Sequence, residues 1–160
     1  MLAARLIATL ACAATFAAVA APAPALAVPV TRNFEFKANV NEFPPVPANS
    51  NGYSACWSYI HGDGREYAII GTYFNGTAIY NVTDPAAPYR VGLIPGPTSL
   101  WREMKSYRNW IYVVTEGTGA GFGLQIIRMT NPEAPVLAAT YTTSFVRSHS
   151  VAVDTARARC

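Results

Sequence analysis

One module occurs twice in this chain, and the duplication constrains the fold more than any local motif does. The stretch YAIIG…TAIYNVTDPAAP at 67–88 returns as IYVVT…GLQIIRMTNPEAP at 111–135. Trp57 corresponds to Trp101, 44 residues later, and the proline-containing ends of the two copies are 47 residues apart. A repeat of this length is typical of the four-stranded blades of a β-propeller.

Each copy predicts four short strands, because runs of β-branched and aromatic residues alternate with turns rich in Gly, Asn, Asp and Pro. Helical periodicity is absent. The predicted fold is all-β: a partial β-propeller of two four-stranded blades plus the first strand of a third, at 148–153. The strands of the two copies are expected at 54–60, 66–72, 77–82 and 89–94, and at 101–107, 110–116, 123–129 and 136–142.

The connections DPAAP and NPEAP explain where the third strand of each copy ends. Asp84 and Asn131 can accept hydrogen bonds from their own backbone two residues on, and the following proline fixes φ. A strand cannot continue through such a segment, so each connection separates the third strand from an outer fourth strand.

The order of these features divides the chain into five segments. Closed propellers usually need four or more blades, so we expect these residues to be the N-terminal part of a longer protein. The remaining blades, in the same or a longer chain, are then expected partners. The segments are a signal peptide at 1–27, a lead-in strand and linker at 28–52, the first blade at 53–97, the second at 98–143 and the start of a third at 144–160.

The N-terminus has the form of a signal peptide. Arg5 precedes an apolar run at 6–21, and Ala25-Leu26-Ala27 fits a signal-peptidase site. The run is too short for a membrane span and is followed by prolines, so we expect no span in the mature chain. We therefore predict a secreted, periplasmic or cell-surface protein.

Charge and cysteine content exclude several partners. Removing Arg5 from the 12 basic residues leaves 11 against 9 acidic ones, with no basic cluster of the kind that binds nucleic acid. Cys56 and Cys160 form a disulfide in an oxidising compartment, or else Cys56 is a small buried hydrophobe. No cysteine or histidine spacing indicates a metal site, and no cofactor is expected.

Five phrases in this order resemble the bacterial LVIVD-repeat proteins, and among them the exported choice-of-anchor B group. The resemblance spans about residues 53 to 154. It implies a β-propeller displayed outside the cell, with a variable C-terminal anchor, and implies no defined catalytic activity. The phrases are CWSY at 56–59, EYAIIG at 66–71, NVTDP at 81–85, WREMK at 101–105 and SHSVAV at 148–153.

Residues at the start of the inner strands are the candidates for ligand binding. Trp101, Arg102 and Glu103 in one unit and His149 in the next are expected to lie near the central channel of a propeller, where ligands often bind. A cluster of this kind can hold an anionic group or a metal. Alternatively, Arg102 and Glu103 pair with polar groups of neighbouring blades and His149 is structural.

The predicted function is an exported or surface-displayed repeat scaffold that binds an extracellular protein or a carbohydrate. Exposed Trp and Tyr side chains suit such recognition, although they also suit packing between blades. A second hypothesis is a propeller hydrolase whose metal-assisted site is completed by further blades. A third is a module that only spaces other domains on a surface.

Overall fold

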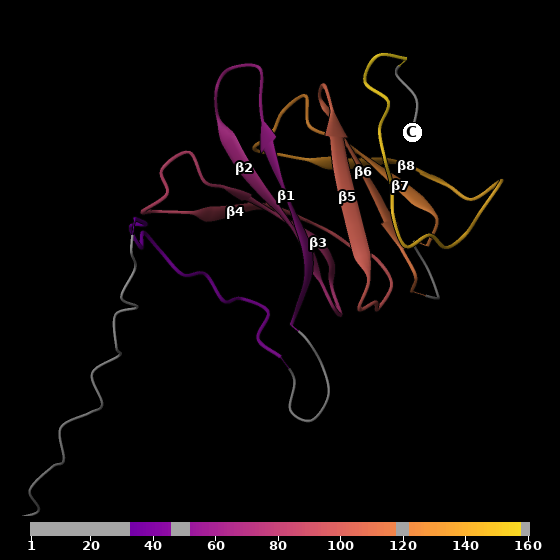
Figure 1. Ribbon diagram of the computed structural model, residues 1–160, viewed down its shortest axis with the longest axis horizontal. Coiled ribbons are helices and arrows are strands. Elements are labelled where there is room, and N and C mark those ends of the chain that lie inside the picture. The colour runs from indigo at the N-terminus through magenta and orange to yellow at the C-terminus, as the bar shows by residue number, and fades with distance from the viewer. Residues whose placement is uncertain (1–32, 46–51, 118–121, 158–160) are drawn as a thin grey trace, which may run out of the picture. The chain divides into compact units, whose positions relative to one another are not determined.

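The computed structural model describes residues 33–45, 52–117 and 122–157 (Figure 1). The signal peptide expected at 1–27 and the Cys160 thiol lie outside these ranges. The chain divides into two compact units, Met1–Glu35 and Phe36–Cys160, and the strands of the described residues belong to the second. The described residues include no helix long and apolar enough to cross a membrane.

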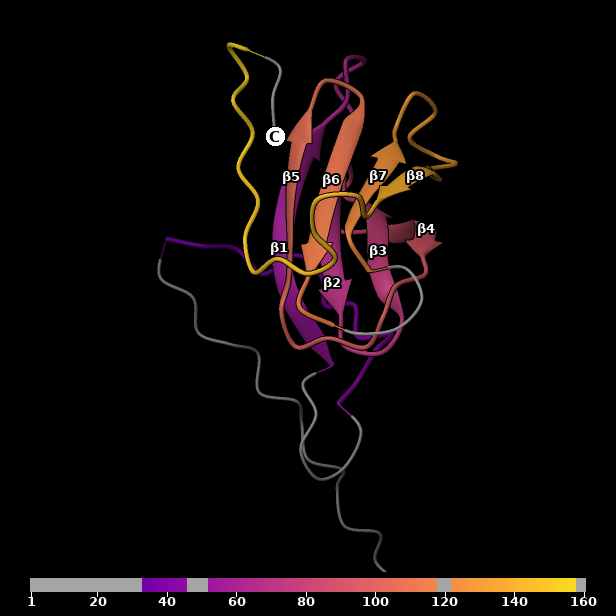
Figure 2. The ribbon, with the colours of Figure 1, turned by 90° about the vertical axis from the view of Figure 1, so that its right-hand side faces the viewer.

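Eight strands form two four-stranded antiparallel sheets, which confirms the all-β class and the two sets of four strands (Figures 1 and 2). Strand order in each sheet follows the chain, so β1 and β5 are edge strands, and they lie next to each other. The strands are β1 (Tyr53–Ile60), β2 (Glu66–Thr72), β3 (Gly76–Asn81), β4 (Tyr89–Ile94), β5 (Arg102–Tyr107), β6 (Trp110–Thr115), β7 (Leu124–Arg128) and β8 (Val136–Tyr141).

The pairing register repeats from one sheet to the other. In both sheets the last two strands shift register at an equivalent point, between Ile79 and Tyr80 and between Ile126 and Ile127. A β-bulge at the same place in both sheets is strong evidence that the two copies are repeats of the same structural unit. One row of paired residues runs through Tyr67, Asn81 and Tyr89 in the first sheet, and through Trp110, Arg128 and Val136 in the second.

This register corrects one correspondence expected from sequence. Tyr59 pairs with Tyr67, and Tyr107 pairs with Trp110. Because Tyr67 and Trp110 are the first residues of the two rows, Tyr59 and Tyr107 are equivalent. Trp57 then corresponds to Lys105, and not to Trp101. The expected spacing was wrong because the turn between β1 and β2 is longer than the turn between β5 and β6.

The two proline-containing connections behave as expected. Asp84 Oδ1 accepts a hydrogen bond from the Ala86 N–H at 2.9 Å, and Asn131 Oδ1 accepts one from the Glu133 N–H at 3.3 Å. Each connection also closes a backbone turn. Because these bonds are local, the chain leaves β3 and β7 and returns as β4 and β8 without a long loop.

One strand expected from sequence does not form, and another is absent from the part of the lead-in that the structure describes. Residues 148–153 are not a strand, and only Asp154 takes part in an isolated bridge. A strand needs a ladder of backbone bonds to a neighbour, whereas this segment donates the Ser148 N–H to the Thr115 carbonyl and then departs from the β-sheet pattern. Residues 33–45, the part of the lead-in that the structure describes, form no strand either.

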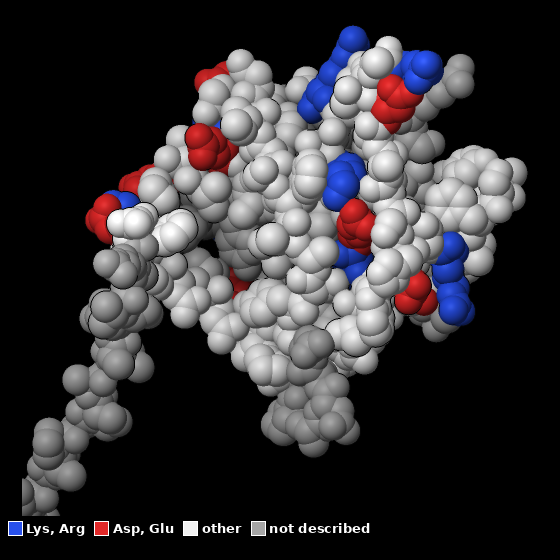
Figure 3. Space-filling view, in the orientation of Figure 1, with Lys and Arg blue, Asp and Glu red and all other residues white. Residues whose placement is uncertain are grey.

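Charged side chains are sparse and mixed in sign on the face drawn in Figure 3. Asp63 pairs with Arg65 at 2.7 Å, Lys105 with Glu103 at 2.7 Å, and Arg157 with Asp154 at 2.9 Å. No extended basic field covers this face, which agrees with the nearly balanced charge of the sequence.

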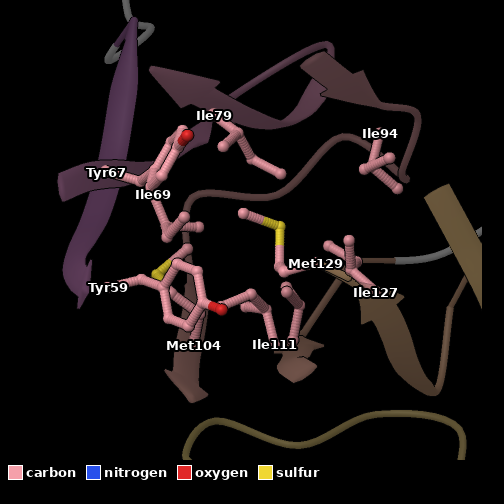
Figure 4. Packing of buried hydrophobic residues seen from close by; sticks show 10 residues of the cluster. Tyr59, Tyr67, Ile69, Ile79, Ile94, Met104, Ile111, Ile127 and Met129 are labelled. Atoms are coloured by element: carbon pink, nitrogen blue, oxygen red, sulfur yellow. The ribbon is translucent and has the colours of Figure 1, made fainter. Parts of the chain in front are cut away.

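The hydrophobic core lies between the two sheets and is shared by both (Figure 4). Tyr59 also bonds across to the second sheet, because its hydroxyl donates to Asn109 Oδ1 at 3.3 Å. The apolar residues of the two sheets thus pack into one cluster. The buried cluster is Tyr59, Tyr67, Ile69, Ile79 and Ile94 from the first sheet, with Met104, Ile111, Val113 and Ile127 from the second and Met129 just after β7.

Candidate functional site

A groove of about 600 Å³ lies between β1 and β5 and brings the four candidate residues together. Since β1 and β5 are the edge strands where the two sheets meet, side chains of both line it. The lining includes Ser54, Ala55, Cys56 and Trp57 on one side, and Leu100, Trp101, Arg102, Glu103, Lys105 and His149 on the other.

Trp101 is the exposed aromatic residue of this groove. Its residue surface is 47 % exposed, and its ring lies beside the His149 imidazole with 5.9 Å between ring centroids. His149 Nδ1 lies 3.0 Å from Glu116 Oε1, so the histidine is held by a carboxylate at the end of β6. The groove thus presents one flat aromatic surface next to a polar ring.

Glu103 and Lys105 provide the charged groups of the groove. Lys105 Nζ lies 2.7 Å from Glu103 Oε1 and 4.2 Å from the centroid of the Trp57 ring, which makes a cation–π contact. The Lys105 ammonium, followed by hydrogen bonds from Ser150 and from the Val151 N–H, holds the pKa of Glu103 below its usual value. The carboxylate is therefore charged at neutral pH.

Arg102 contributes its backbone to the groove, while its side chain points into the protein. The residue is 1 % exposed, and its Nη2 donates to the Pro97 carbonyl. Nε and Nη1 are buried without a hydrogen-bond partner among the described residues, and burial lowers the pKa of the guanidinium to about 10. A Cβ added to Gly96 would lie 2.7 Å from Nη1, so the guanidinium packs directly on that backbone.

Cys56 also lines the groove and corrects one of the alternatives left open by the sequence. It is exposed rather than buried, and it is not disulfide-bonded to any described residue. It pairs with Ile70, whose side chain points away from the neighbouring Ile69 in the core. Cys56 consequently faces the side of the first sheet that the second sheet does not cover.

That side of the first sheet holds a second hollow of about 370 Å³, which is largely apolar. Val40 of the lead-in segment lines it together with Ile70 and Tyr80. An ion pair between Arg90 Nε and Glu42 Oε2 at 3.3 Å ties the same lead-in segment to β4. None of the four candidate residues lines this hollow.

Sequence reasoning missed a carboxylate that joins the two sheets. Glu133 lies in the connection between β7 and β8, and four side chains of the first sheet bind it. Its Oε1 accepts from Arg65 Nη1 at 2.8 Å, from the Tyr67 hydroxyl at 2.5 Å and from Asn81 Nδ2 at 2.8 Å, and its Oε2 accepts from the Tyr89 hydroxyl at 3.0 Å. We call these four donors the Glu133 seat.

The signal that points to Glu133 is present in the duplication. Its counterpart in the first connection is Ala86, so a charged residue replaces a methyl group between two otherwise similar segments. Burial alone raises the pKa of Glu133, but the hydrogen bonds from Tyr67, Asn81 and Tyr89 outweigh it and lower the pKa. The carboxylate is held in its charged form at the joint between the sheets.

The described residues contain no group of three or more His, Cys, Asp or Glu side chains placed to hold a metal ion. The side chains that line the groove offer an aromatic surface, a carboxylate, an ammonium and an imidazole. No protein-family model matches the chain, and neither a curated protein nor a solved structure is significantly similar to it.

Proposed function

We propose that this chain belongs to an exported or surface-displayed repeat scaffold of the LVIVD type, in which the two sheets are consecutive blades of a β-propeller. The repeated register, the shared bulge and the adjacency of the edge strands β1 and β5 support this proposal. Inner strands of neighbouring blades line the channel of a propeller, and β1 and β5 take that place here.

The scaffold binds a carbohydrate of the extracellular surroundings in the groove between β1 and β5. The observation that carries this assignment is the exposed indole of Trp101 beside the Glu103–Lys105 pair. A flat aromatic ring covers the apolar face of a sugar ring. An adjacent carboxylate accepts hydrogen bonds from the sugar hydroxyl groups, and an adjacent ammonium donates hydrogen bonds to them. His149 adds a further polar group at the edge of the indole.

Binding of the full chain to a panel of immobilised glycans tests this assignment. Trp101→Ala should weaken binding about fivefold or more, because truncation of a central aromatic contact typically removes over 1 kcal/mol. Phe74→Ala is the matched control, since Phe74 is also 47 % exposed but does not line the groove. Equal binding by the Trp101→Ala variant, or binding to peptides but to no glycan, would contradict the carbohydrate assignment.

A further inference from the structure

The Glu133 seat shows how one module of this kind holds the next. Within it, Tyr67, Asn81 and Tyr89 form one paired row across three strands, and Arg65 lies just before that row. The carboxylate of the following module inserts into this row from its proline-containing connection. The interface between the two sheets therefore has a polar lock at one end, in addition to the hydrophobic core.

The repeated register places an equivalent set of residues on the second sheet, on the side turned away from the first. Trp110, Arg128 and Val136 form the corresponding row, and Arg108 lies two residues before Trp110, as Arg65 lies two residues before Tyr67. We call these four residues the Arg128 seat. It carries two arginines where the Glu133 seat carries one arginine and an asparagine.

The Arg128 seat is open and positively charged. Arg108, Arg128 and Val136 are exposed, and a hollow of about 290 Å³ runs along Arg128 and Val136. No ion pair to either arginine occurs within the described parts of the chain. The segment that follows β8 contacts β6 at Thr115, the last residue of that strand (Figure 2). The Arg128 seat contains Trp110, which is the first residue of β6 and lies at its opposite end.

We infer that the Arg128 seat docks a further module of the same type, through an acidic residue in the connection between that module's third and fourth strands. Charge complementarity defines the partner: a glutamate or aspartate placed as Glu133 is, two residues after the Asn or Asp of the connection. An identical copy of this chain fits poorly, because its first connection carries Ala86 and its Glu133 is already bound. This inference rests on the repeat-scaffold part of the proposed function and is independent of the ligand in the groove.

A duplication within the full chain tests the inference. A second copy of residues 98–143 is inserted between 143 and 144, so that its glutamate, the copy of Glu133, faces the original Arg128. That glutamate and the original Arg128 are each changed to Ala, singly and together, and unfolding is followed in urea. The double-mutant cycle should give a coupling of about tenfold in the unfolding equilibrium constant. Because Arg128 is exposed, its substitution leaves the core intact.

A parallel cycle with Arg147→Ala is the control, since Arg147 is an exposed arginine outside the seat, and it should show no coupling. Additive effects of the glutamate and Arg128 substitutions would overturn the inference. So would self-association of the unaltered chain that Arg128→Glu abolishes, because an identical copy would then occupy this face. Failure of the unaltered chain to bind any glycan would refute only the carbohydrate assignment of the groove and would leave the inference about the Arg128 seat standing.

Discussion

Arg102 carries a positive charge into the space between the sheets, where its guanidinium donates a hydrogen bond, among the described residues, to the Pro97 carbonyl alone. Burial of a cation without a counter-charge is costly, and methionine has a similar length without the charge. We expect Arg102→Met to leave the free energy of unfolding unchanged or to raise it by up to about 2 kcal/mol. Arg102→Ala should lower it by about 2–5 kcal/mol, because it leaves a cavity. Urea denaturation of both variants measures the difference, and an equal loss in the two would show that the charge itself is stabilising.

The sequence led to the right neighbourhood for the candidate residues but not to the direction of every side chain. Trp101, Glu103 and His149 present their side chains to the groove, whereas the guanidinium of Arg102 is buried. Neighbouring residues of a strand point to opposite faces, and which face is the core depends on where the other sheet packs. Glu133 could have been found from the sequence, because it is the charged exception in the duplicated connection.

The turn between β2 and β3 depends on the conformational freedom of one glycine. Gly76 has φ of 109°, and a Cβ added there would lie 2.1 Å from the Ile94 carbonyl oxygen. Gly76→Ala should therefore lower the free energy of unfolding by about 2–4 kcal/mol, from the unfavourable φ and from the displaced end of β4. Gly62, in the turn after β1, is the matched control because a Cβ there meets nothing within 4 Å.

Thermal unfolding of the two glycine variants checks this difference. Gly62→Ala should change the midpoint little, whereas Gly76→Ala should lower it by about 10 °C or more. Similar midpoints for both variants would mean that β3 and β4 can separate without cost to the rest of the sheet.

The strands themselves were predictable to within one or two residues. Turn residues such as the Asn75-Gly76 pair and the proline-containing connections set their ends locally. The register between the two copies was not predictable from spacing alone, because the turns between their first two strands differ in length. The strand expected at 148–153 depended on a pairing neighbour, which the sequence pattern of the segment alone could not supply.

At the scale of the whole molecule, we expect the two sheets to unfold together, because they share a core and are joined at one end by Glu133. Hydrogen bonds from the first sheet lower the pKa of this carboxyl against the opposing effect of burial. A group whose pKa is lower in the folded state stabilises the fold at pH values above its ordinary pKa of 4.5. That contribution is lost as the pH falls from 4.5 through the lowered folded value, where protonation removes the charge that Arg65 and the two tyrosines bind.

Comparison with Glu133→Gln isolates this contribution, since glutamine keeps the shape of the side chain but does not titrate. At pH 7 the variant should be less stable by about 1–2 kcal/mol, because charge-assisted hydrogen bonds become neutral ones. The difference should shrink as the pH is lowered below 4.5, while acidic groups that share no partner with Glu133, such as Asp154 beside Arg157, titrate equally in both proteins and cancel. Urea denaturation at a series of pH values between 7 and about 3 measures it. A difference that stays constant over this range would mean that Glu133 stabilises the joint by its shape and not by its charge. The requirement for an acidic residue at the Arg128 seat, which is inferred from Glu133, would then lose its support.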